Sequence, residues 1–394
     1  MKIKHSLVSL ALFFISPAVS LILSLFMLSA SKNNKFYYTI ISLSIGYIFI
    51  FTPPLGDLYR HYNTFLKLDN DIYINKDLFL HSLFFIIKYL YIPFELIPAT
   101  FIFLSVFLIL SAFNNIISIS EKNYRKFEYI IMHIIVLLSI NYFTIASGLR
   151  FGLAVSILTY GLCHYIRYNN IMALLFIVLF SSFIHFTLLY FILPILFSIF
   201  IKINFRTFVL LLILGFISSL FSDIAFRFIV NIIHYGRSYI DGVWASSEDK
   251  NLHGKIRVIL NQIPFFFFLL LFLITSRKIK SSLLFWICIF TSLTYFSYTL
   301  FTRLSSIPVF LMIFYILSKD KILIIKNIIL IFVFSYFMVD TIYGYRRQIL
   351  LGEMWKAPFY SPLIYIVNPN NDFDILIKEV DHNGFWIKNP VKTN

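Results

Sequence analysis

The chain has 394 residues and a net charge of +15; 60% of its residues are hydrophobic and 20% are aromatic, whereas only 13% are charged. A soluble domain of this length could not cover such an apolar surface with polar groups. The Lys and Arg residues are spread over connecting segments without a basic, aromatic-rich cluster, so nucleic acid is not an expected partner. Cys163 and Cys288 lie inside apolar runs without metal-ligand spacing and are typical of packing residues.

Apolar stretches of about 17–25 residues, the length needed to cross a membrane, recur along the chain. The first, from Ser6 to Ala30, follows Lys2 and Lys4. It is longer than the core of a cleavable signal peptide, which remains the alternative. Hydropathy predicts about twelve transmembrane helices without a clear internal repeat, near 6–30, 37–52, 94–118, 128–147, 149–166, 170–186, 187–201, 207–222, 256–275, 283–301, 304–318 and 322–341.

The charges of the short loops predict the orientation of this bundle. One set of alternate loops holds fourteen Lys and Arg against three acids, while the opposite side holds nineteen cations and fifteen acids. Short loops rich in Lys and Arg stay in the cytoplasm, so both termini are predicted to lie outside, in the periplasm. Lys2 and Lys4 argue weakly for the opposite placement of the N-terminus.

On this topology a transmembrane domain, 1–341, carries two external loops, 52–93 and 222–255, and precedes an extracytoplasmic tail, 342–394. Within the first loop, the apolar segment Leu78–Tyr91 is too short to span and is predicted to lie as a helix in the membrane interface.

Three ionisable residues, Arg150, His185 and Arg303, lie at joints between apolar runs, and all three joints are predicted to face outward. Such residues next to hydrocarbon are costly and often mark a site. Arg has a planar fork of donors that suits phosphate oxygens, and His can act as a base near neutral pH. The alternatives are Arg side chains that reach toward the interface from helix ends, and a His that only packs.

The first external loop contains Asp57, Arg60, His61 and Tyr62 after two prolines. Carboxylates and aromatic rings at a cavity mouth suit sugars, although a solvated loop is an equal alternative. Nucleotide-binding, zinc-protease and similar motifs are absent or unsupported by their context, so neither a metal nor a cofactor is expected.

At these residues the chain resembles the EpsG-like branch of the O-antigen and exopolysaccharide polymerases, the Wzy proteins. The matching segments are Ala146–Ala154, Arg167–Asn170, Ser181–Thr187, Gly56-Asp57, Thr302–Leu304 and Trp355–Pro362. A Gln often follows the Arg in that branch, whereas Phe151 stands here, so a hydrogen-bonding role cannot be carried over to this position.

The resemblance implies an all-α bundle with a periplasm-facing cavity, of the GT-C-like polymerase type, in the bacterial inner membrane. It implies a glycosyltransferase that joins undecaprenyl-diphosphate-linked repeat units among membrane lipids, with a chain-length regulator as a further partner. Arg150 and Arg303 would bind the diphosphate, and His185 or Asp57 would be the catalytic base. The residues expected to bind the substrate glycan are Arg60, Tyr62 and Tyr360. A flippase for the same lipid and an extracytoplasmic acyltransferase are the alternatives.

Overall fold

The computed structural model describes residues 2–30, 34–68, 78–120, 124–222, 224, 227–228, 252–275, 281–319 and 323–367, with only the backbone described for 2–6, 252–258, 323 and 366–367. Every regular element in these ranges is a helix, as the sequence predicted. Most of the second external loop and the tail beyond residue 367 lie outside the described residues.

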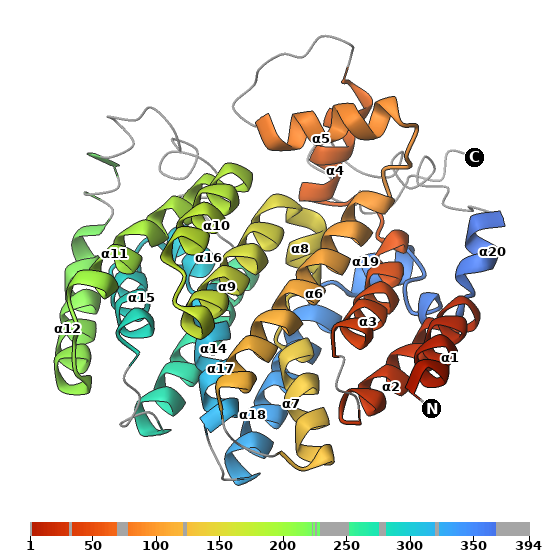
Figure 1. The fold of residues 1–394 in the computed structure, drawn as a ribbon. Helices are drawn as coiled ribbons and strands as arrows, with labels where there is room; N and C mark the ends of the chain where they lie inside the picture. Colours follow the sequence, from red (N-terminus) through yellow and green to blue (C-terminus); the bar gives the residue numbers. More distant parts are fainter. Residues whose placement is uncertain are drawn as a thin grey trace. The chain divides into compact units, whose positions relative to one another are not determined.

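The chain forms two compact units, coloured along the sequence in Figure 1. Unit 1 comprises Met1–Tyr160, Phe183–His185 and Leu323–Asn394. Its helices are α1 (Lys2–Ile15), α2 (Pro17–Leu28), α3 (Asn34–Ile48), η1 (Phe49–Phe51), α4 (Asp57–Leu66), α5 (Leu78–Tyr89), α6 (Leu96–Ile119), α7 (Lys126–Leu138), α8 (Tyr142–Gly148), the first part of α9 (Arg150–Tyr168), α18 (Leu323–Tyr336), the π-helix η5 (Phe337–Tyr343), α19 (Arg346–Leu351), η6 (Ala357–Phe359) and α20 (Pro362–Val367).

Unit 2 comprises Gly161–Ser182 and Phe186–Ile322. It holds the end of α9 and most of α10 (Ile171–Ile184), followed by η2 (Phe186–Phe191), α11 (Ile192–Phe200), α12 (Phe205–Ser218), η3 (Ser219–Phe221), α14 (Leu252–Thr275), α15 (Ser282–Ser292), α16 (Tyr298–Leu304) and α17 (Ser306–Lys319). Within this unit α15 packs against α11, α12 and α17.

Fewer helices qualify as membrane spans than the twelve predicted. By length and composition, three helical stretches among the described residues are long and apolar enough: Leu96–Ile119, Tyr298–Lys319 and Ile324–Tyr343. The pair Lys126–Leu138 and Tyr142–Gly148, bent by 40°, forms a fourth if it is one broken span. Seven further apolar helices are shorter, and six of them overlap predicted spans, so the apolar runs are broken more often than hydropathy indicates.

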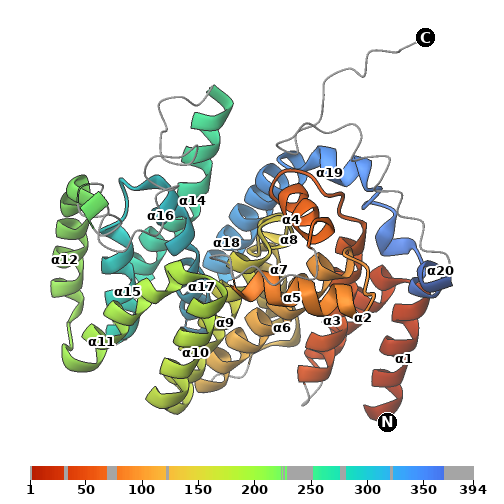
Figure 2. The ribbon, with the colours of Figure 1, turned by 90° about the horizontal axis from the view of Figure 1, so that it is seen from above.

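The predicted first span, 6–30, is not a single helix. Pro17 begins a second helix, α2, after α1 has ended at Ile15. The Ser20 hydroxyl donates a hydrogen bond to the Ser9 carbonyl oxygen at 2.7 Å, although these residues would lie about 16 Å apart in a straight helix. The chain therefore folds back at Ser16, and α1 and α2 form a helical hairpin, which Figure 2 shows from above.

Close backbone approach holds the core of unit 1 together. A Cβ atom on Gly46 of α3 would come within 2.9 Å of the Ala99 carbonyl oxygen and 3.1 Å of the Phe103 Cβ atom in α6. Small residues at such positions let membrane helices pack backbone to backbone, where dispersion contacts are densest. An ion pair between the fully buried Lys326 of α18 and the partly exposed Glu128 of α7 joins these two helices. Lys326, one of the fourteen cations counted above for the predicted cytoplasmic loops, thus lies inside the unit and not in an exposed loop.

The first external loop is more ordered than the sequence indicated. Residues 57–66 form helix α4, whereas the sequence favoured a loop there. Gly56, the N-cap of α4, has a φ of 60°, a backbone conformation that residues with a Cβ atom rarely adopt. The apolar segment predicted to form an interfacial helix is α5, which ends at Tyr89.

Candidate functional site

Helix α4 presents the polar side chains of the first external loop. Asp57 lies in its first turn, where the helix dipole stabilises a negative charge. Asp57 also forms an ion pair with Arg60, one turn later, and both side chains remain substantially exposed. The carboxylate is therefore held ionised beside a cation at the surface of unit 1.

His61, on the same helix, lies close to Arg150. Burial lowers the pKa of His61 from its usual 6.5 to about 4, and the positive charges of Arg150 and Arg60 contribute to the shift. The imidazole is consequently neutral at physiological pH while two guanidinium groups remain charged beside it. Because α4 packs against α8, the helix that immediately precedes Arg150, the two segments are held together by the fold.

Arg150 begins α9 directly after a strained turn. Leu149, fully buried, has φ 47° and ψ −81°, a conformation that is unfavourable for a residue with a branched side chain. Gly152 makes the turn possible, since a Cβ atom there would come within 2.4 Å of the Ile145 side chain. Backbone strain of this kind clusters at functional sites because only a surrounding fold can hold it.

His185 occupies the break between α10 and η2 and is 6% exposed. Its imidazole ring contacts the Phe151 ring edge to face, with the ring centroids 5.1 Å apart. Phe151 follows Arg150, so the position that distinguishes this chain from the resembling branch packs directly on the candidate base. An aromatic wall restricts the orientation of the imidazole without forming a strong hydrogen bond to it.

Arg303 lies in unit 2, in the last turn of α16, and is half-buried. Nearby in this unit, the Asn261 side-chain amide of α14 donates to the Tyr298 hydroxyl at 3.2 Å. Since Arg150 belongs to unit 1 and Arg303 to unit 2, a clamp made from both arginines stays a prediction.

The two tyrosines expected to bind substrate have packing neighbours of their own. The Tyr62 ring meets the Phe94 ring with centroids 5.0 Å apart. Tyr360 is 48% exposed and follows η6, which packs on α2 and α3. The Ser16 hydroxyl donates a hydrogen bond to the carbonyl oxygen of the neighbouring Pro358 at 3.3 Å. This bond connects the segment to the turn of the helical hairpin.

Asp340 is a polar residue that the sequence analysis did not select. It is 7% exposed, lies in the π-helix η5, and accepts a hydrogen bond from the Asn141 side-chain amide at 2.7 Å. The Asn141 side-chain oxygen in turn caps α8 by accepting from the Thr144 amide. An acid near the end of an apolar run and a π-helix are both frequent at functional sites. The acid was visible in the sequence, whereas the π-helix was not.

These residues give unit 1 a cationic surface with neutral acceptors beside it. Arg60 and Arg150 supply charged donors that suit phosphate oxygens, and the neutral His61 imidazole adds a nitrogen acceptor or donor. Among the described residues, no group of three or more His, Cys, Asp and Glu side chains has the arrangement of a metal site.

Comparisons with known proteins agree with the resemblance seen in the sequence. No curated protein and no solved structure matches the chain. The EpsG family matches residues 35–350, which include α4, the Leu149 turn, His185 and Arg303. The chain therefore belongs to the EpsG family.

Proposed function

We propose that this protein is a glycan polymerase that joins oligosaccharide repeat units carried on undecaprenyl diphosphate, on the outer face of the bacterial inner membrane. Membership of the EpsG family supports a role in exopolysaccharide or O-antigen polymerisation. The observation that carries the assignment to this site is the pairing of Arg150 with a neutral His61 beside Arg60. Such a surface favours an anionic group close to neutral hydrogen-bonding partners.

In the proposed reaction, a hydroxyl oxygen of one lipid-linked unit attacks the anomeric carbon of the growing chain. The bond between that carbon and the diphosphate oxygen breaks, and undecaprenyl diphosphate leaves with the electron pair. Arg150 and Arg303 would stabilise the negative charge that develops on the diphosphate. The acceptor proton would pass to His185, with Asp57 as the competing base.

The Asp57–Arg60 ion pair bears on the choice between these two bases. A carboxylate paired with a guanidinium is a weaker base, because the neighbouring cation favours the ionised form. His185 is buried and packs edge to face on the Phe151 ring. We therefore place His185 as the base, and Asp57 with Arg60 and Tyr62 as groups that position the sugar. Tyr360 would contact a more distant part of the glycan.

The experiment that tests this function is reconstitution of the full-length protein in liposomes with a lipid-diphosphate-linked repeat unit. The expected result is a ladder of products with release of one undecaprenyl diphosphate for each unit added. Arg150→Lys and Arg303→Lys keep the charge but lose the planar fork, and each is expected to slow elongation about 10²-fold. Transport of the lipid-linked unit across the bilayer without elongation would contradict the proposal and favour a flippase.

A further inference from the structure

A cavity of about 380 Å³ lies within unit 2, and none of the residues that line it has been assigned a role above. Two lysines, Lys202 and Lys319, line it, and none of the described residues that line it is acidic. Its wall also carries serine and tyrosine hydroxyls, from Tyr165, Ser198, Ser281, Ser282 and Tyr315. The Ser198 and Ser282 hydroxyls already donate to the Ile195 and Ile201 carbonyl oxygens. The groups of the lining that can donate to a ligand are therefore the two lysine ammonium groups and the hydroxyls of Tyr165, Ser281 and Tyr315.

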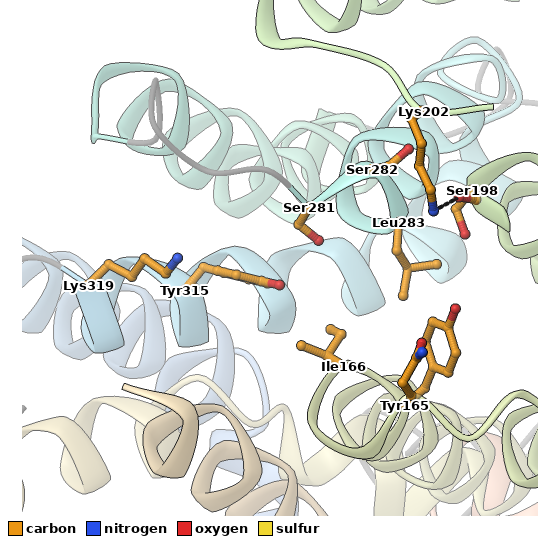
Figure 3. A pocket seen from close by; sticks show the side chains of 10 residues that line it. Tyr165, Ile166, Ser198, Lys202, Ser281, Ser282, Leu283, Tyr315 and Lys319 are labelled. Atoms are coloured by element: carbon orange, nitrogen blue, oxygen red, sulfur yellow. Dashed lines mark hydrogen bonds between the residues drawn. The ribbon is translucent and has the colours of Figure 1, made fainter. Parts of the chain in front are cut away.

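Figure 3 shows how these groups are disposed. In this view the Lys202 ammonium and the Tyr165 hydroxyl lie on one side of Leu283, and the Tyr315 hydroxyl and Ser281 lie on the other. The Lys319 side chain lies beyond Tyr315, with its ammonium 5.9 Å from the centroid of the Tyr315 ring. The Lys202 ammonium donates one hydrogen bond to the Ser198 carbonyl oxygen, at 2.8 Å, which fixes its position while an ammonium has three donors in total.

The walls of the cavity are braced by the backbone that surrounds them. The Ile201 carbonyl oxygen, next to Lys202, accepts hydrogen bonds from the Ser282 hydroxyl at 3.1 Å and the Trp286 indole at 2.9 Å. These two bonds fasten the end of α11 to the start of α15. The first residues of α15 therefore face the cavity and add the positive end of the helix dipole to the charge of the lysines.

We propose that this cavity binds a phosphate group, and that its source is the headgroup of an anionic phospholipid. Two ammonium groups, several hydroxyls and a helix N-terminus match the charge and the acceptor-rich surface of a phosphate. The loop charges predict that Lys202 and Lys319 lie on the cytoplasmic side, where the leaflet is rich in anionic lipids. Phe200 and Met172, both more than 70% exposed on helices of this unit, suit contact with acyl chains beside such a headgroup.

The test measures binding to the full-length protein in a neutral detergent by titration calorimetry. The titrants are short-chain phosphatidylglycerol, short-chain phosphatidylcholine and inorganic phosphate. Phosphatidylglycerol is expected to bind with measurable affinity and phosphatidylcholine is not. In Lys202→Gln/Lys319→Gln the affinity should fall about 30-fold, since each lysine near an anionic surface contributes about five-fold.

Two further variants separate a specific site from general charge attraction. Lys35→Gln/Lys126→Gln removes two exposed cations on the same predicted side of the membrane but outside the cavity, and should bind like the wild type. Lys202→Arg/Lys319→Arg retains the charge and should keep most of the affinity, which guards against misfolding of the glutamine variant. Equal loss in both glutamine pairs would overturn the proposal. Lysine-dependent binding of inorganic phosphate without binding of phosphatidylglycerol would keep a phosphate site and overturn the lipid as its source.

Discussion

The chemistry of the candidate site depends on which side chains carry a charge at neutral pH. Arg60 and Arg150 are charged, while the nearby His61 is not, because burial and both cations oppose its protonation. The substrate diphosphate is expected to lie beside the arginines, where charge-assisted hydrogen bonds are strongest. His185 contacts the ring of Phe151, which stands where the EpsG-like branch often has a Gln.

The proximity of His61 to Arg150 predicts a measurable titration. In the wild type, NMR of labelled histidine should give a pKa for His61 of about 4. Arg150→Gln removes a positive charge that disfavours the imidazolium, so the pKa should rise while remaining below 6.5, since burial is the largest cause of the shift. Arg125→Gln removes an exposed charge elsewhere in unit 1 and should leave this pKa unchanged. An unchanged pKa in Arg150→Gln would show that the two side chains do not interact.

The role of His185 predicts a specific cellular phenotype. If His185 takes the acceptor proton, His185→Ala should block chain growth, with a loss of about 10²–10⁴-fold, and leave the transfer of single repeat units intact. His185→Gln retains a hydrogen bond but cannot take up a proton at neutral pH, so it should also lack the ladder of long chains. Gel analysis of surface polysaccharide at matched protein levels checks both variants. A full ladder from His185→Gln would transfer the role of base to Asp57 or another group.

At the scale of elements, breaks in the helices position the site. The joint between 128–147 and 149–166 was visible in the sequence, and the structure places it at Leu149 with a positive φ. Hydropathy cannot predict such a turn, because it is averaged over a window of residues and does not depend on the backbone conformation of any one of them. Helix α4 was also missed as a helix, since its polar composition resembles that of an exposed loop.

Gly152 and Gly148 flank this joint and give a matched pair of substitutions. Gly152→Ala would place a Cβ atom 2.4 Å from the Ile145 Cγ1 atom and 2.9 Å from its Cα atom, so the turn must shift. The overpacking should destabilise the protein by about 1–3 kcal/mol and lower its melting temperature in detergent. Gly148→Ala meets open space and should leave the melting temperature nearly unchanged. Equal tolerance of the two substitutions would mean that the turn relaxes freely.

At the scale of the whole molecule, the sequence predicted the helical class and the family correctly, and these are now shown. It predicted the number of spans less well, since proline and polar breaks divide several apolar runs into helices too short to cross. The orientation of the bundle and the grouping of Arg150 with Arg303 stay predictions. Both depend on how segments far apart in the sequence are arranged in space. Local composition does not determine this arrangement, and the two units are each described by themselves.

The predicted orientation is checked by labelling single cysteines with a reagent that does not cross membranes. Cysteines at Thr64 and Ser246 should react in intact spheroplasts, and those at Asn123 and Ile279 only after the membrane is opened. The native Cys163 and Cys288 are buried, so the background should be low. The reverse pattern would place the proposed catalytic face in the cytoplasm and would contradict the proposed function.

The helical hairpin of α1 and α2 changes the predicted number of membrane crossings. At 14 and 12 residues its arms are about 21 and 18 Å long, shorter than the ~30 Å of hydrocarbon that a span must cross. Without this crossing, Lys2 lies on the same side as the next loop, which the charges predict to be cytoplasmic, whereas the C-terminal tail is predicted to lie outside. A fluorescent protein fused before Lys2 should mature in the cytoplasm, whereas alkaline phosphatase fused there should stay inactive.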